Sequence, residues 1–235
     1  MVKKNTLGKL ATSVIKEFKG SLSSIEPTCT HIYVDSLASE DVILAVHAYF
    51  MPERTDATVH VSKLSDGVSL VSNRTSQRNN GSAIPDIAVI IPTPTSACED
   101  ALVMLASHAI PCAVVVESAV EAPKIADTLF DTGLITVIAG TTEEALFDRL
   151  STWIATTVDK AVSFAAAYPS CRESVVKQIT SACAKENVAI GAVALVPGSD
   201  MPLMTARQIR LALDITSAYN IDMSIETIAE LLGVV

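Results

Sequence analysis

The sequence predicts an α/β fold, with a three-layer, mostly parallel, doubly wound sheet followed by an all-helical C-terminal domain. Three apolar runs support this prediction, because strands of consecutive Val, Ile and Ala are buried on both faces in a parallel sheet. The runs are DIAVIIP (86–92), PCAVVVE (111–117) and LITVIAG (134–140). A helical segment joins each run to the next, so right-handed β-α-β crossovers place helices on both faces. The aromatic share of 4% also favours an aliphatic core.

The first strand and helix of the sheet precede these runs. THIYVD (30–35) has a β-type pattern, and Ser39 is expected to cap the following helix, up to about Phe50, by accepting backbone N–H bonds. Residues 31–47 therefore form a strand, a tight turn and a helix, the layout in which many nucleotide-binding proteins carry a phosphate loop. This turn contains no glycine and no lysine.

Two short strands are predicted after the first helix. They are ATVHVS (57–62) and GVSLVS (67–72), and a turn at residues 65–67 separates them. Such a hairpin would place an antiparallel pair at one edge of the sheet. The polar segment 73–85 has no period and predicts a surface loop.

Three helix starts are predicted from capping-box spacing, in which Glu follows a hydroxyl residue by three positions. The first helix runs to about His108, the second ends before Gly133, and the third extends through Trp153. The three pairs are Ser96 with Glu99, Ser118 with Glu121, and Thr141 with Glu144.

The strand pattern ends at about Asp159, and only helical segments follow. They are predicted at 160–168, 171–194, 201–219 and 224–232, separated by Pro, Gly and Asn. The predicted organisation is a basic amphipathic N-terminal helix at 1–28, an α/β domain at 29–158 and a helical domain at 159–235.

Residues 7–22 place apolar side chains at helical spacing on one face, with lysines outside it. Packing of this helix on its own domain is the favoured interpretation. A contact with an anionic membrane or with a partner groove stays open. The lysines that would make a peripheral membrane contact are Lys3, Lys4, Lys9, Lys16 and Lys19.

The amino-acid composition indicates which compartment and which kinds of partner to expect. The net charge of −9 disfavours nucleic acid as a partner. The five cysteines are odd in number, widely spaced and never in a C-x-x-C pair, and no apolar signal segment opens the chain, so reduced thiols in the cytoplasm are expected. The longest apolar run is about half the roughly 20 residues of a membrane-spanning helix, so no such helix is predicted.

The order of predicted elements resembles that of small GTPase domains and looks like an Era-type G domain. The tail, PGSDMPLMTARQIRLALDITSAYN (197–220), is similar to the helical domain of unknown function that follows Era-like GTPase domains in many bacterial proteins. The matching positions are Pro197, Asp200, Met204 to Gln208 and Tyr219, with Asn220 where that pattern has Gly.

The nucleotide-binding residues that this resemblance implies are missing. In the phosphate-loop slot the hydroxyls of Ser36 and Ser39 remain, but Asp35 and nearby acids stand where phosphates would lie, and no Gly or Lys is present. The Asp-x-x-Gly slot falls at 73–76. The base-reading slot begins with Glu117 and Ser118, and neither slot matches. The resemblance therefore indicates a degenerate G domain, a pseudo-GTPase, with no nucleotide or other cofactor.

The leading hypothesis is a non-catalytic interaction or scaffold protein that binds a protein partner or a second copy through its C-terminal helices. Methionines near the starts of these helices suit an adaptable interface. The alternative is a GTP- or GDP-binding switch with unorthodox motifs, in which loop 73–85 moves with ligand; catalysis, if present, would be GTP hydrolysis. A coincidental element order in another doubly wound domain also stays open.

Other chemistry has little support in the sequence. The four histidines, His31, His47, His60 and His108, are dispersed without metal-ligand spacing, so no metal site is expected. No serine or cysteine has the context of a catalytic nucleophile. The helix start at 140–142 has the form of an anion site, although simple capping is the favoured interpretation. A receiver-like phosphoacceptor domain is a poor match, because no Lys follows the last strand.

Overall fold

A computed structural model describes residues 25–68, 84–193 and 201–221. The predicted helices at 7–22 and 224–232, with the five N-terminal lysines, lie outside the described residues. So do most of the predicted loop at 73–85 and most of the predicted strand at 67–72.

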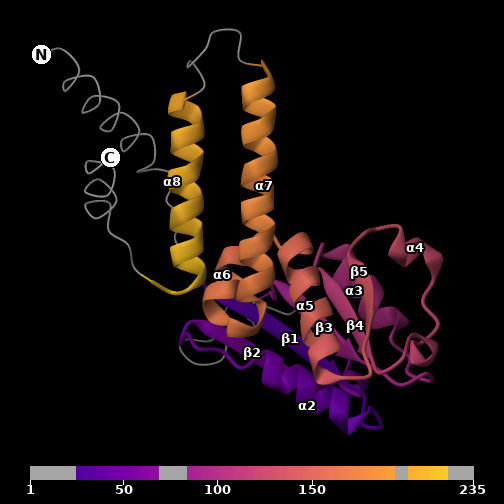
Figure 1. The fold of residues 1–235 in the computed structure, drawn as a ribbon. Helices are drawn as coiled ribbons and strands as arrows, with labels where there is room; N and C mark the ends of the chain where they lie inside the picture. The colour runs from indigo at the N-terminus through magenta and orange to yellow at the C-terminus, as the bar shows by residue number, and fades with distance from the viewer. Residues whose placement is uncertain (1–24, 69–83, 194–200, 222–235) are drawn as a thin grey trace, which may run out of the picture.

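The described core is a five-stranded sheet in which every pairing is parallel (Figure 1). The strand order is β2-β1-β3-β4-β5, so the chain reverses its direction of winding between β1 and β3. The strands are β1 (Thr28–Val34), β2 (Ala57–Lys63), β3 (Ile87–Ile91), β4 (Cys112–Val116) and β5 (Ile135–Ala139).

Helices cover both faces of this sheet. The helices α2 (Glu40–Tyr49), α5 (Glu143–Thr157) and α6 (Ala161–Ala167) pack on one face, and α3 (Glu99–Ser107) and α4 (Asp127–Phe130) pack on the other. The prediction of a three-layer, doubly wound α/β fold is therefore confirmed, as is the run of helices at the C-terminal end. The remaining elements are α7 (Arg172–Val193), α8 (Met201–Ala218) and the 3-10 turns η1 (Leu64–Asp66), η2 (Ala119–Glu121) and η3 (Pro169–Cys171).

The edge strand β2 pairs in parallel with β1 over its full length, from Thr28 opposite Ala57 to Val34 opposite Lys63. The chain after β2 forms η1, and Gly67 follows at a φ of 75°, where a side chain would be strained. The predicted antiparallel partner of β2 falls from residue 69 onward outside the described residues.

The predicted helix from Ser118 to before Gly133 is wrong. Only η2 and the four-residue α4 form there, and Ala122 between them is extended, with φ −63° and ψ 135°. The physical reason is Pro123, because a proline disfavours the helical conformation of the residue before it. This effect outweighed the capping-box spacing of Ser118 and Glu121.

The other three predicted caps also differ from the prediction. The hydroxyl of Ser39 makes no capping hydrogen bond, although Ser39 occupies the N-cap position of α2. For α5, Thr142 rather than Thr141 is the cap, and its hydroxyl accepts a bond from the backbone N–H of Ala145. The N-cap of α3 is Cys98, and the hydroxyl of Ser96 binds elsewhere.

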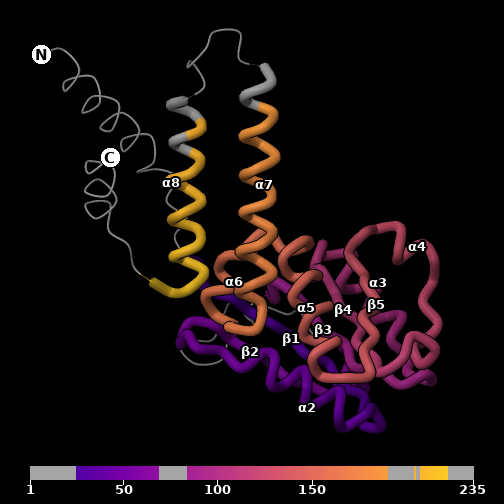
Figure 2. The backbone as a smooth tube through the Cα atoms, in the orientation of Figure 1, coloured from indigo at the N-terminus to yellow at the C-terminus, as the bar shows by residue number. Residues whose placement is uncertain are grey.

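One hydrophobic core spans the predicted domain boundary at residue 158. Phe164, Tyr168, Val175 and Ala218 belong to the same buried cluster as the sheet residues under α2 and α5. Beyond this base, α7 and α8 run side by side and project from the α/β layers (Figures 1 and 2). We call the pair α7 and α8 the arm.

Candidate functional site

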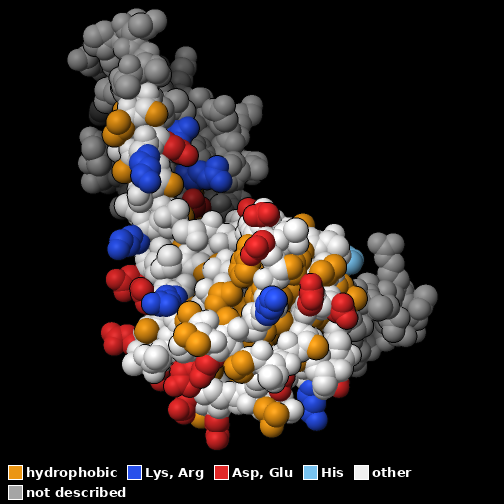
Figure 3. Space-filling view, turned by 90° about the vertical axis from the view of Figure 1, so that its right-hand side faces the viewer, with side chains coloured by type: hydrophobic (Ala, Val, Ile, Leu, Met, Phe, Trp, Pro, Cys, Tyr) orange, Lys and Arg blue, Asp and Glu red, His pale blue; other side chains and the backbone are white. Residues whose placement is uncertain are grey.

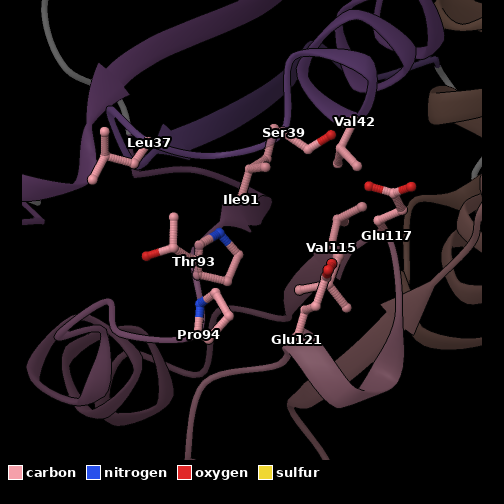
Figure 4. Close-up of a pocket in the computed structure, with 11 residues that line it drawn as sticks. Leu37, Ser39, Val42, Ile91, Thr93, Pro94, Val115, Glu117 and Glu121 are labelled. Atoms are coloured by element: carbon pink, nitrogen blue, oxygen red, sulfur yellow. The ribbon is translucent and has the colours of Figure 1, made fainter.

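In doubly wound sheets, ligands bind outside the carboxyl ends of the strands, where the strand order reverses. Here that point lies between β1 and β3, and it holds a pocket of about 230 Å³ (Figure 4). Three segments build the pocket. Leu37 and Ser39 come from the β1–α2 turn, Thr93 and Pro94 follow β3, and Glu117 and Glu121 follow β4.

A hydrogen-bonded bridge fixes the wall of this pocket. The hydroxyl of Ser96 donates to Asp35 Oδ2 over 2.5 Å and accepts from the backbone N–H of Thr93 over 2.7 Å. Asp35 Oδ1 accepts from the backbone N–H of Leu37 over 3.0 Å. The bonds from Ser96 and then from Leu37 lower the pKa of Asp35, so this residue is an ionised carboxylate that ties the β1–α2 turn to the loop after β3.

The structure brings together some of the residues that the sequence indicated. Ser39 and Glu117 line the pocket, and Asp35 supports its wall. The carboxylate of Glu117 lies near Val42 on the α2 side (Figure 4). Ser36 is exposed, Ser118 is half-buried, and neither is among the described lining residues. The contribution of Glu121 and the bridging role of Ser96 were missed, because both residues had been assigned to helix caps.

The electrostatic character of the pocket is acidic. Glu117 and Glu121 line it, and no Lys, Arg or His is among its described lining residues. A second pocket of about 570 Å³ is lined by α2 and the start of α5 and also includes Glu117. This pocket is also lined by Asp41, His47 and Glu143 and by the helix start at 140–142. Two like charges about 4 Å apart repel by roughly 4 kcal/mol at an effective dielectric near 20, so the pocket that Glu117 and Glu121 line disfavours phosphate.

A third pocket, of about 370 Å³, is an apolar groove between α2 and the edge of the sheet at β2. Its lining includes Phe50 and Met51 from the end of α2 and Val59 and Val61 from β2. This composition suits an apolar group rather than a nucleotide.

A separate cluster of possible metal ligands lies on β1 and β2. One ligand atom from each of Cys29, His31 and His60 falls within 4.8 Å of the other two. Cys29 and His31 are buried, and His60 is exposed. Burial, with a contribution from His60, lowers the pKa of His31, so its imidazole is neutral at pH 7. The spacing of these residues along the chain had indicated no such cluster, since His31 and His60 meet only through the pairing of the two strands.

Comparison with protein-family models, with curated proteins and with solved structures found no match to this chain. Across residues 25–68, 84–193 and 201–221, none of the helices combines the length and the apolar character that a bilayer crossing requires.

Proposed function

We propose that the protein is a non-catalytic interaction or scaffold protein, in which a pseudo-GTPase-like α/β domain carries an arm that binds another protein chain. The observation that carries this proposal is the acidic pocket at the strand-order reversal, where Glu117 and Glu121 are present and the described lining residues include none of the cations and glycines that a triphosphate needs. A domain that keeps the architecture of a nucleotide-binding fold but disfavours the nucleotide retains a structural role.

The surface and the thiols are consistent with this role in the cytoplasm. All five cysteines are free thiols, as expected in a reducing compartment. On the face of the α/β domain shown in Figure 3, acidic side chains and a smaller number of basic ones lie around a central apolar area. An acidic surface favours protein partners over nucleic acid.

The arm supplies the proposed binding surface. At 1.5 Å per residue, the 22 residues of α7 extend about 33 Å and the 18 residues of α8 about 27 Å. Among the described residues of α7, only Val175, near its base, is fully buried. On α8 several aliphatic side chains are half-buried, namely Ile209, Leu211, Leu213 and Ile215.

Two helices alone leave part of each apolar stripe in water, and two such hairpins side by side form a four-helix bundle. A second copy of this chain is therefore the proposed occupant of the arm. Charges of both signs lie along the arm, including Lys177, Glu186 and Arg210, so two arms need not repel one another.

The proposed pairing of two arms is tested by light scattering, which measures the mass of the full chain in solution over a range of concentrations. We expect a dimer that Leu211→Glu converts to a monomer. The matched control is Gln208→Glu, which adds the same charge at an exposed position of the same helix and should leave the dimer intact. A chain that is monomeric at every concentration would contradict pairing of arms, and a dimer unaffected by Leu211→Glu would place the interface elsewhere.

Nucleotide exclusion is tested by thermal unfolding with GTP, GDP and ATP at millimolar concentration with Mg²⁺. A ligand at 100 times its dissociation constant adds about 2.7 kcal/mol to the free energy of unfolding. Because we propose that the chain does not bind nucleotide, we expect no shift in its unfolding temperature. The double variant Glu117→Gln, Glu121→Gln removes two charges from the pocket and should bind nucleotide more tightly than the parent chain. A clear shift with the parent chain would instead support the alternative, a nucleotide-binding switch. The observation in favour of that alternative is the 570 Å³ pocket at the helix start near Thr142.

A further inference from the structure

Strand pairing brings Cys29, His31 and His60 to one place on the sheet. Cys29 and His31 are two residues apart on β1, so both side chains point to the same face. His31 lies directly opposite His60 in the parallel pairing of β1 with β2. The two imidazole rings are 4.9 Å apart, centroid to centroid, with an interplanar angle of 69°. Three side chains with metal-binding atoms therefore converge from two adjacent strands.

The buried imidazole of His31 has one nitrogen without a partner. The side chain is only 5% exposed. Its Nδ1 lies 3.2 Å from the hydroxyl of Tyr33, while Nε2 is buried and has no hydrogen-bond partner. A buried polar atom without a partner costs about 1–3 kcal/mol, so it points to a missing ligand.

We propose that Cys29, His31 and His60 form a zinc-binding site. Thiolate and imidazole are ligands that zinc prefers, and two histidines with one cysteine leave one position of a tetrahedral ion open. Tetrahedral geometry at zinc–ligand distances of about 2.0–2.3 Å separates ligand atoms by about 3.3–3.6 Å. Atoms within 4.8 Å of one another need to approach by up to about 1.5 Å to reach these separations. Rotation of the exposed His60 side chain provides the part of this movement that brings His60 to the other two ligands.

The surroundings hold the two buried ligands in place. The backbone N–H of Cys29 donates to Asp86 Oδ2 over 2.8 Å, and the backbone N–H of Asp86 donates to the carbonyl of Cys29, also over 2.8 Å. Lys160 pairs with Asp86 Oδ1 at 2.7 Å and so neutralises the nearby carboxylate. Tyr33 orients His31 through Nδ1, as a metal-bound histidine is usually oriented through its second nitrogen. On binding, the thiol proton of Cys29 passes to solvent and the thiolate ligates the ion.

The open position is on the His60 side, where the cluster reaches solvent. Water or a donor group from a partner completes the tetrahedron. This site is independent of the arm and of the acidic pocket, because it lies on the face of the sheet opposite α2 and α5.

The test uses the full chain after removal of metal with a chelator, with Co²⁺ as the spectroscopic probe and Zn²⁺ as the competitor. We expect one equivalent of Co²⁺ to give visible bands of tetrahedral intensity and a thiolate-to-cobalt charge-transfer band, all of which Zn²⁺ abolishes. Cys29→Ser should remove the charge-transfer band. His60→Gln should weaken zinc affinity by more than about 100-fold. Tyr33→Phe should weaken it by about 10–100-fold, the range for residues that hydrogen-bond to a metal ligand.

The controls carry the same residue types on other elements. Cys183→Ser on α7 and His108→Gln after α3 should leave the spectrum and the affinity unchanged. Because a substitution at buried His31 can prevent folding, the exposed ligand His60 decides the test, with tryptophan fluorescence as the check on folding. Absence of a thiolate band at one equivalent, or a band that survives Cys29→Ser, would overturn the proposal. Equal losses of affinity in His108→Gln and His60→Gln would overturn it as well.

Discussion

The hydroxyl of Ser96 donates a 2.5 Å hydrogen bond to Asp35, and this contact joins two loops that are 61 residues apart in the chain. It lies beside the last bond of the β1–β3 pairing, in which the backbone N–H of Asp35 donates to the carbonyl of Ile91. The carboxylate of Asp35, for which the sequence resemblance implied a phosphate-loop slot, is therefore committed to a structural contact. A phosphate beside Asp35 would have to displace this contact as well as approach a negative charge.

The first prediction concerns the pH dependence of this contact. Since the pKa of Asp35 is lowered in the folded chain, its carboxylate contributes stability above the unfolded-state pKa of about 3.9 and loses that contribution as pH falls through the folded value. The stability difference between the parent chain and Asp35→Asn should be largest above about pH 5 and should shrink below about pH 4. Urea unfolding across this range measures it. Asp131→Asn, at an exposed position, should stay within about 0.5 kcal/mol of the parent throughout.

The second prediction concerns Arg172, which anchors the base of the arm. Its Nε donates to the carbonyls of Ala165 and Ala218, over 3.0 and 3.1 Å, and its Nη2 binds Glu53 Oε2 over 2.6 Å. The guanidinium also lies 5.8 Å from the ring centre of Tyr219. We expect Arg172→Met to lower the free energy of unfolding by about 2–4 kcal/mol, because it leaves carbonyl groups without donors.

A lysine has a single ammonium group, whereas Arg172 donates from both Nε and Nη2 of its planar guanidinium. Arg172→Lys should therefore lower the free energy of unfolding by less than Arg172→Met, but should not restore the parent value. Lys177→Met, on the exposed surface of the same helix, is the matched control. Amide exchange should also rise near the base of α8 in Arg172→Met. Unchanged exchange there would show that other contacts hold the arm.

The strands β1, β3 and β4 were predictable because burial on both faces leaves a signal in each run taken alone. The order of the strands was not, since the pairing of β2 with β1 depends on contacts across the whole domain. Glu117 lines the pocket because it follows β4, and the carboxyl ends of parallel strands share one edge of the sheet. The helix after Ser118 was missed because the effect of Pro123 was weighed too lightly. The meeting of His31 with His60 has no spacing rule. The strand predicted at 30–35 also left out Cys29, so the face that Cys29 shares with His31 on β1 was not recognised.

The third prediction concerns a buried chain of hydroxyls between α2, α5 and η3. Tyr49 Oη lies 3.0 Å from Ser151 Oγ, which donates to the carbonyl of Ser170 over 2.9 Å, so the tyrosine hydroxyl is the donor in the first bond. Tyr49→Phe removes one bond and should cost about 1 kcal/mol of unfolding free energy. Ser151→Ala leaves both neighbours without their partner and should cost about 2–3 kcal/mol. The double variant should cost less than the sum, since the two substitutions remove the same bond. Additive losses in chemical denaturation would mean that the two hydroxyls are not coupled.

The fourth prediction concerns Phe164 on α6, which is fully buried in the core that spans the predicted boundary at residue 158. Phe164→Ala removes a large side chain from this core and should lower the unfolding free energy by about 3–5 kcal/mol. Trp153 is the only tryptophan and lies on α5, so its fluorescence reports on the α/β layers, while far-ultraviolet circular dichroism also reports on the arm.

Because one core joins these parts, both signals should shift together in Phe164→Ala and keep a common midpoint. The control is Phe130→Ala on α4, where the side chain is 40% exposed and its loss should cost much less. If the fluorescence midpoint stayed in place while the dichroism midpoint moved, the helices after residue 158 would fold as a separate unit. In that case the two sides of the predicted boundary would unfold independently, and the contacts of Phe164 would not couple the arm to the sheet.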